Sequence, residues 1–218
     1  MSKDLWLKRI RNYTGFLGAI LPWLCLLGYY IAHKFGDYPL LDSFPNSMSI
    51  TYYVCPILAM ILTTASIVLM CYDGYDKQDS IITTISGLFG LLIVLFPCAD
   101  SNGVYTAMGI FNRAGFFQTP LWLNPIIHNA SAVIFFCLLA YNSIFLFTKH
   151  KGTMTYRKTV RNIIYRVCGI GMLISMSLMI LPVHFAHKVF WVEAVALTFF
   201  GISWLTKGGL IMGDKTDG

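Results

Sequence analysis

Charged side chains are scarce in this sequence of 218 residues. Asp, Glu, Lys and Arg together make up 12% of the chain, whereas 56% of it is hydrophobic. A water-soluble domain carries roughly 25% charged residues, so this chain lacks the polar surface that a soluble body needs. The basic residues, which give a formal net charge of +6, lie between apolar runs instead of forming a nucleic-acid-binding surface. The composition therefore predicts a protein surrounded by lipid, with no nucleic acid as a partner.

Paired cysteines and common catalytic motifs are also absent. The six cysteines show no C-x-x-C spacing, and the chain contains neither H-E-x-x-H nor G-x-S-x-G. A disulfide framework or a zinc ribbon is therefore not expected. The first apolar run is longer than the core of a signal peptide, and no small-x-small cleavage site follows it, so we expect a retained first helix.

Long apolar runs are the dominant feature that is present. A helix needs about 20 apolar residues to cross the hydrocarbon core of a membrane. Six runs approach or exceed this length, at residues 13–32, 50–72, 81–97, 123–147, 163–181 and 189–205. No connecting segment is long enough to separate domains. The sequence therefore predicts an all-α fold: one integral membrane domain over residues 1–218, built as a six-helix transmembrane bundle.

The distribution of Lys and Arg predicts the orientation of these spans. Alternate connections and both chain ends would hold 13 of the 16 basic residues, and the opposite side would hold Lys34, Arg113 and Lys188. Cytosolic loops are enriched in Lys and Arg, so we expect both termini in the cytosol. The expected location is the plasma membrane of a bacterium or an endomembrane of a eukaryote.

Unexplained polar residues gather on the other, outer side of this predicted bundle. Glu193, the single glutamate of the chain, lies in the sixth apolar run. Ionisable residues inside a span are costly and usually face the bundle interior. The candidate ligand-binding residues on this side are His128, Glu193, Ser49, Ser131 and Asp100. A structural alternative stays open for each of them, and Asn46 or Ser47 would cap the second helix.

A metal site is the second interpretation of the same side. His128, His184 and His187, with Asp100 and Glu193 nearby, offer ligand types that bind zinc. The spacing of these residues is not diagnostic, and an ordinary polar rim hydrogen-bonded to Glu193 fits it equally. We therefore expect no cofactor, and zinc stays the alternative.

Small residues predict where the helices approach one another. Gly87 and Gly90 lie in the third run, and Gly169 and Gly171 lie in the fifth. Without side chains, these positions permit close contact between helices in lipid. The pattern indicates a packed bundle instead of a pore.

Three stretches resemble one known family. A P-x-x-x-S pattern spans Pro45–Ser49, an H-N-x-x-A-x-x-x-F pattern opens the fourth run at His128, and a W-x-E pattern spans Trp191–Glu193. With the six-span layout, these patterns resemble the family of damage-regulated autophagy modulators, FGF-receptor-activating proteins and Sfk proteins. Ser203–Gly208 is more similar to uncharacterised bacterial six-span families. The resemblance implies membrane trafficking, lipid-anchor remodelling or phosphoinositide regulation, with Ser49, His128 and Glu193 as a shared polar core.

Three hypotheses about function follow. The leading one is a non-enzymatic membrane protein that binds lipid, a protein partner or a second copy of itself through the outer polar pocket. The second is a metal-dependent lipid hydrolase or transferase, similar to alkaline ceramidases and adiponectin receptors, although the histidine patterns of that family are missing. The third is a subunit of an oligomeric channel or membrane effector.

Overall fold

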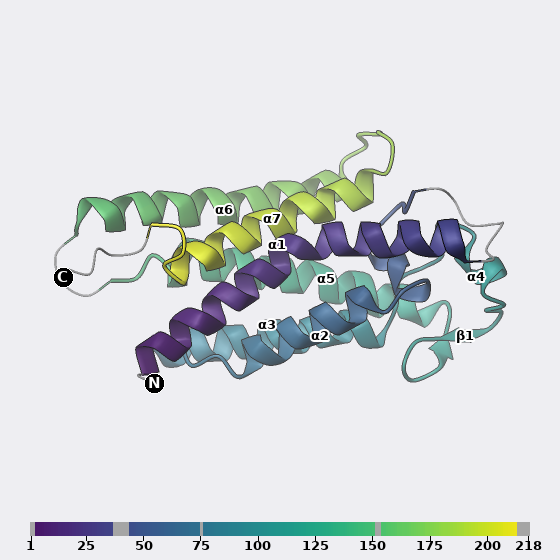
Figure 1. Ribbon diagram of the computed structural model, residues 1–218, viewed down its shortest axis with the longest axis horizontal. Helices are drawn as coiled ribbons and strands as arrows, with labels where there is room; N and C mark the ends of the chain where they lie inside the picture. Colours follow the sequence, from purple (N-terminus) through teal and green to yellow (C-terminus); the bar gives the residue numbers. More distant parts are fainter. Residues whose placement is uncertain (1–2, 37–43, 75, 151–153, 213–218) are drawn as a thin grey trace.

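A computed structural model describes residues 3–36, 44–74, 76–150 and 154–212, so Lys151 and Lys215, which the orientation argument uses, lie outside the described residues. The elements are α1 (Lys3–Phe35), a short 3-10 helix η1 (Ser49–Tyr53), α2 (Ile57–Met70), α3 (Lys77–Leu95), α4 (Val104–Ala107), β1 (Arg113–Ala114), β2 (Thr119–Pro120), α5 (Leu123–Tyr141), a π-helical turn η2 (Asn142–Leu146), α6 (Tyr156–Ile180) and α7 (Lys188–Lys207). The long helices lie side by side as a bundle (Figure 1).

Five of these described helices are long and apolar enough to cross a membrane. They are α1, α3, α5 with η2, α6 and α7. Many of their large apolar side chains face outward, including Ile163, Val167, Ile170 and Ile174 on one side of α6. Exposure of so many apolar side chains to water would be unfavourable, so the outer surface of the bundle suits lipid. The prediction of a multi-pass helical membrane protein is therefore confirmed.

The second predicted span differs from a continuous helix over residues 50–72. Pro56 has no amide hydrogen and restricts the residue before it, so the chain breaks between η1 and α2. Helix α2 has 14 residues, and at 1.5 Å per residue it is about 21 Å long. By itself it is shorter than the hydrocarbon core, which is about 30 Å thick.

The other helix boundaries follow local chemistry. Helix α3 starts four residues before the predicted run because the Asp76 carboxylate accepts a hydrogen bond from the Asp79 amide at 3.0 Å. The Thr155 hydroxyl caps α6 in the same manner, with Lys158 N at 3.2 Å. Helix α1 bends partway along its length (Figure 1), and Pro22 inside it removes one backbone hydrogen bond. The predicted all-α fold has one small exception, because β1 and β2 pair as an antiparallel two-residue hairpin.

Glycines permit the closest helix contacts, as predicted for α3. Helix α3 packs on α2, and a Cβ atom at Gly87 would overlap the Ser66 backbone oxygen. The α1–α7 contact, which the sequence analysis did not identify, depends on Gly15 and Gly201 in the same way. A Cβ atom on Gly15 would lie 2.9 Å from the Gly201 oxygen. The helix backbones therefore touch directly at these two places.

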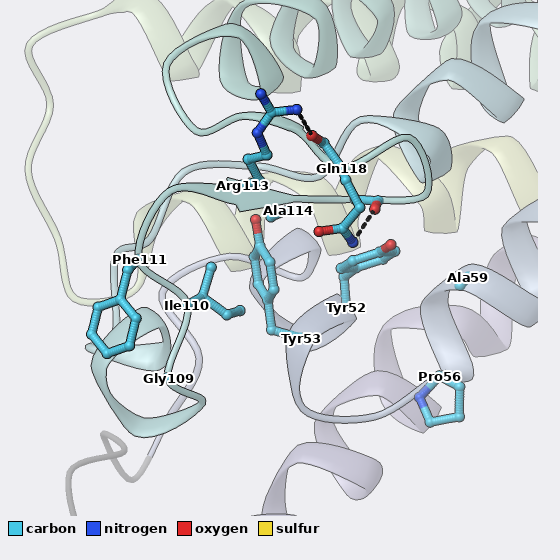
Figure 2. Close-up of a pocket in the computed structure, with 11 residues that line it drawn as sticks. Tyr52, Tyr53, Pro56, Ala59, Gly109, Ile110, Phe111, Arg113, Ala114 and Gln118 are labelled. Carbon is cyan, nitrogen blue, oxygen red and sulfur yellow. Dashed lines mark hydrogen bonds between the residues drawn. The ribbon is translucent and has the colours of Figure 1, made fainter.

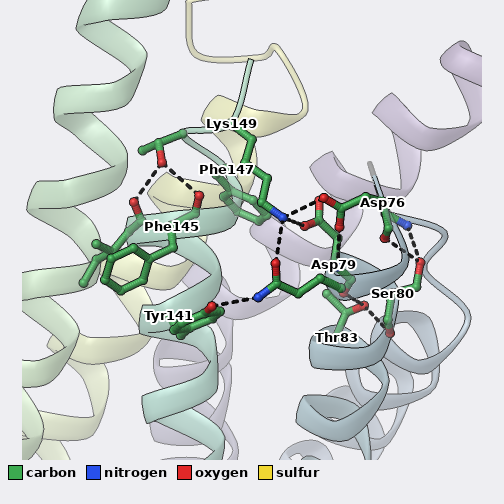
Figure 3. A network of polar contacts seen from close by, with 12 residues as sticks. Asp76, Asp79, Ser80, Thr83, Tyr141, Phe145, Phe147 and Lys149 are labelled. Carbon is green, nitrogen blue, oxygen red and sulfur yellow. Dashed lines mark hydrogen bonds and ion pairs between the residues drawn. The ribbon is translucent and has the colours of Figure 1, made fainter. Parts of the chain in front are cut away.

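An ionic network ties α3 to the segment after η2 (Figure 3). Lys149 Nζ lies 2.7 Å from Asp76 Oδ2 and 3.0 Å from Asp79 Oδ1, and it also donates to Gln78 Oε1 at 3.2 Å. The hydrogen bond from Lys149 lowers the pKa of Asp76. Gln78 in turn donates to the Tyr141 hydroxyl at 2.9 Å, which completes the link from α3 to α5.

Substituting Gly87 with alanine tests the α2–α3 contact. The new methyl group meets a backbone oxygen that cannot rotate away, and such overpacking typically costs about 1–3 kcal/mol. We expect a lower thermal transition in detergent, although alanine gains up to about 1 kcal/mol of intrinsic helix stability. Ala130→Val, at an exposed position on α5, is the control and should leave the transition unchanged. An unchanged transition for Gly87→Ala would show that the two helices are further apart.

Candidate functional site

The end of α3 creates the first requirement of the candidate site. The Ile93 carbonyl would normally accept a hydrogen bond from the amide four residues later, but that residue is Pro97, which has none. The chain turns at Phe96 into an extended conformation, with φ −120° and ψ 95°. The carbonyl oxygens of Ile93 and Phe96, at the end of this helix, therefore need donors from elsewhere.

His128 of α5 supplies the donor. Its Nδ1 atom lies 3.1 Å from the Ile93 oxygen and 2.9 Å from the Phe96 oxygen. The side chain is 4% exposed, so water does not compete for these bonds. Since carbonyl oxygens only accept, Nδ1 carries the hydrogen and Nε2 is directed toward the other side of the ring. His128 thus joins α5 to the end of α3.

Ser49 and Glu193 continue the chain of hydrogen bonds into η1 and α7. Ser49 Oγ lies 3.0 Å from His128 Nε2 and 3.4 Å from Glu193 Oε1. The other carboxyl oxygen, Oε2, accepts a hydrogen bond of 2.7 Å from the Met48 amide, next to the start of η1. We call His128, Ser49 and Glu193 the polar junction. It brings three of the five predicted ligand-binding residues together and ties α3, α5, η1 and α7 to one another.

Counting hydrogens constrains the charges of the polar junction. In the neutral imidazole Nε2 accepts, so the Ser49 hydroxyl donates to it and has no second hydrogen for Glu193. The contact with Glu193 is then a hydrogen bond only if the carboxyl group carries a proton. Alternatively, Ser49 donates to an ionised Glu193 and a doubly protonated His128 donates to Ser49. In both arrangements the two residues together are neutral, which avoids the large cost of an unpaired buried charge.

The remaining predicted residues have separate surroundings. Asp100 Oδ1 accepts from the amides of Asn102 and Val104 at 3.0 and 2.9 Å, and Oδ2 accepts from Tyr105 N at 3.0 Å. The Asp100 carboxylate therefore holds the turn that starts α4. Ser131 is buried one turn after His128 on α5.

The three predicted metal-ligating histidines are dispersed. His184 is exposed before α7, and His187 Nδ1 bonds to Asn46 Oδ1 at 3.1 Å, whereas His128 lies in the polar junction. Across the described part of the chain, no three His, Cys, Asp or Glu side chains are grouped closely enough to hold a metal ion. The polar junction is accordingly described by hydrogen bonding alone.

Two asparagines connect the loops at this end: Asn46, which the sequence suggested only as a helix cap, and Asn102, which it did not indicate. Asn46 N donates to Asn102 Oδ1 at 2.9 Å, and Asn102 Nδ2 donates to the Phe44 oxygen at 2.9 Å. Ser47 Oγ accepts from Ile50 N at 3.2 Å beside the start of η1, but the N-cap residues of η1 and α2 are Met48 and Pro56, without a side-chain cap bond, so the predicted cap by Asn46 or Ser47 is not formed. Both asparagines lie in turn-like stretches, PNS and DSNG, and this composition is the signal that could have identified them.

One hollow is lined by residues of the polar junction, and a second is lined by η1. The first is a partly open cavity of about 40 Å³, lined by apolar side chains of α1, α2, α3, α5 and α7 together with Ser49 and Glu193. It is much smaller than a cavity of about 150 Å³ that binds benzene, so it suits water more than an acyl chain. A larger groove of about 610 Å³ lies outside, between η1, the start of α2 and residues 109–118 (Figure 2).

The Ser49–His128 pair resembles the nucleophile and base of a serine hydrolase in one respect, the hydrogen bond of 3.0 Å. Two features oppose that chemistry. Glu193 contacts the serine instead of orienting the histidine, and the cavity beside Ser49, at about 40 Å³, has no space for an ester and its substituents. The geometry therefore favours a structural frame over acyl transfer.

Comparisons with known proteins found no matching family model, no matching curated protein and no matching solved structure. The sequence resemblance described above thus stays a prediction, and the functional argument depends on the geometry of the chain itself.

Removing Ser49 or His128 tests the polar junction. Ser49→Ala leaves the buried His128 Nε2 without its partner, and His128→Leu leaves two carbonyl oxygens without a donor. Each change is expected to destabilise the protein by about 1–3 kcal/mol. If the two side chains are coupled, the double variant should lose about 0.5–3 kcal/mol less unfolding free energy than the sum of the two single losses. Unfolding is followed in titrations with sodium dodecyl sulfate.

Ser175→Ala provides the matched control, because the buried Ser175 hydroxyl bonds only to the Gly171 oxygen of its own helix, at 2.8 Å. The loss of unfolding free energy caused by Ser175→Ala should simply add to the loss caused by His128→Leu. Full additivity of Ser49→Ala with His128→Leu would show that the two side chains are not coupled.

Proposed function

We propose that this chain is a non-enzymatic, multi-pass membrane protein that binds a membrane lipid at the end of the bundle where the polar junction lies. The observation that carries the proposal is the groove of about 610 Å³ between η1, the start of α2 and residues 109–118. Its lining is amphipathic: Arg113 and Gln118 are polar, whereas Pro56 and Ala59 form an apolar wall at the start of α2. Membrane lipids combine these two chemistries in one molecule.

The polar junction and the groove share η1. Ser49 begins this short helix and faces the buried hydrogen bonds, while Tyr52 and Tyr53, at its other end, line the groove. The Tyr53 hydroxyl donates to the Cys98 oxygen at 2.7 Å, which holds the wall of the groove against the loop after α3. In this proposal the junction positions η1, and η1 shapes the lipid site. The predicted role of the outer polar residues in ligand binding is thereby indirect.

The proposal includes six crossing segments with both termini in the cytosol. Helix α2 and η1 together would form the sixth crossing, since five residues of 3-10 helix add about 10 Å to the length of α2. The start of α1 and the end of α7 lie at the same end of the bundle (Figure 1), which supports an even number of crossings. The excess of Lys and Arg at that end supports a cytosolic location for it.

Protease protection tests the crossings and their orientation. In sealed, right-side-out vesicles, epitope tags at both chain ends should be protected, whereas a tag inserted between Gly109 and Ile110 should be cleaved. Five crossings would place the two chain ends on opposite sides. Exposure of one terminal tag alone would therefore contradict the six-span arrangement.

Filling the groove tests lipid binding. Ala59→Phe places a ring against the apolar wall, so we expect less lipid to co-purify with the protein, as measured by mass spectrometry of extracted lipids. Ala130→Phe adds the same ring at an exposed position on α5, away from the groove lining, and should retain wild-type lipid. Equal lipid retention by Ala59→Phe and the wild type would contradict binding at this groove.

A further inference from the structure

Arg113 contributes the only charged side chain among the described residues that line the groove. It is exposed and comes from β1 (Figure 2). No Asp or Glu occurs between residues 101 and 122, so its own segment offers no carboxylate to pair with it. The groove therefore presents a positive charge at its polar side.

The hairpin holds Arg113 in place. Its Nη1 atom donates to the Gln118 backbone oxygen at 3.3 Å, and the Gln118 side chain donates to the Gly115 oxygen at 3.1 Å (Figure 2). Gly115 and Gln118 both have left-handed backbone conformations in this turn, with φ of 83° and 49°. One of the five N–H donors of the guanidinium is used in this bond, and the planar fork suits two oxygens of a phosphate.

Exposed aromatic side chains flank Arg113 in the sequence. Phe111 is 79% exposed, Phe116 74% and Trp122 69%, all within 12 residues of the chain. Trp is enriched where the hydrocarbon core meets water, and exposed apolar patches mark surfaces that contact a membrane or a partner. In a membrane this pattern would favour headgroup depth for the segment, with Arg113 near the lipid phosphates, while Ala59 lies on α2, which would continue into the hydrocarbon.

We propose that the groove binds an anionic membrane phospholipid, with the Arg113 guanidinium on its phosphate. The Tyr52 side chain lines the same groove and offers a hydroxyl as a second donor. The acyl chains leave over Pro56 and Ala59 along α2. This proposal rests on the proposed function, lipid binding at this end of the bundle. It adds that the lipid is anionic and that Arg113 recognises it.

The test measures lipid binding to the full chain by native mass spectrometry, with phosphatidylglycerol and phosphatidylcholine as the added lipids. The wild type should bind phosphatidylglycerol more tightly. Arg113→Gln should weaken that binding about tenfold, because a charge-assisted phosphate contact is lost. Phosphatidylcholine binding should change much less, because the choline ammonium offsets the charge of its phosphate and leaves little net attraction to Arg113. Equal binding of the two lipids by the wild type, or unchanged phosphatidylglycerol binding by Arg113→Gln, would overturn the proposal.

Lys34→Gln is the matched control. Lys34 is an exposed basic residue of α1 that does not line the groove, so its loss should leave the preference intact. A loss of preference equal to that of Arg113→Gln would mean that general surface charge is responsible, and would also overturn the proposal. An unchanged thermal transition of Arg113→Gln in detergent establishes that the fold is retained.

Two further experiments distinguish failure of this proposal from failure of lipid binding at the groove, and lipid binding from binding of free phosphate. If Ala59→Phe weakens binding of both lipids while Arg113→Gln changes neither, the groove binds lipid but does not recognise the phosphate through Arg113. If Ala59→Phe changes nothing, the premise itself is wrong. Added inorganic phosphate should not displace phosphatidylglycerol, and complete displacement would assign the site to a free phosphate.

Discussion

Helix α3 ends against Pro97 inside an apolar environment, and the carbonyl oxygen of Ile93 is left without its usual donor. A buried carbonyl without a partner costs free energy that water would otherwise recover. His128 removes that cost, with Nδ1 at 3.1 Å from this oxygen. The same ring then needs a partner for Nε2, which is Ser49, and Ser49 lies against Glu193. One missing amide hydrogen thus explains why polar side chains of α5, η1 and α7 meet near the end of α3.

The polar junction also explains how a short helix can keep a defined position. The break at Pro56 separates η1 from α2, so η1 is not held by a continuous helical backbone. Glu193 holds it from α7 through the Met48 amide, and the Ser47 hydroxyl closes its first turn through Ile50. The groove wall formed by Tyr52 and Tyr53 depends on this anchoring. The shape of the groove and the stability of the bundle are therefore physically linked through η1.

The two ends of the bundle use different interactions. At the end where α3 begins, Lys149 joins Asp76 and Asp79 in an ionic network that water partly reaches. At the other end, His128, Ser49 and Glu193 form a hydrogen-bonded chain that also includes the backbone of Ile93, Phe96 and Met48 and has no net charge. Between them, the helices touch through glycines, with Gly87 against α2 and Gly15 against α7. In lipid, where apolar contact alone gives little preference for one partner, these close approaches select which helices pack together.

Hydropathy along the chain was enough to predict five long apolar helices and the class of protein, because hydropathy over about 20 residues depends on composition and not on partners. It did not predict the break at Pro56, which divides the second run into η1 and α2. The sequence also placed Ser49, His128 and Glu193 on one side, since alternating spans bring every second connection together. The tertiary structure alone decided that His128 caps α3, that Asn46 and Asn102 join the loops, and that Arg113 lines a groove with Tyr52. Each of these depends on residues distant in the chain coming together in space, which no local pattern of residue types encodes.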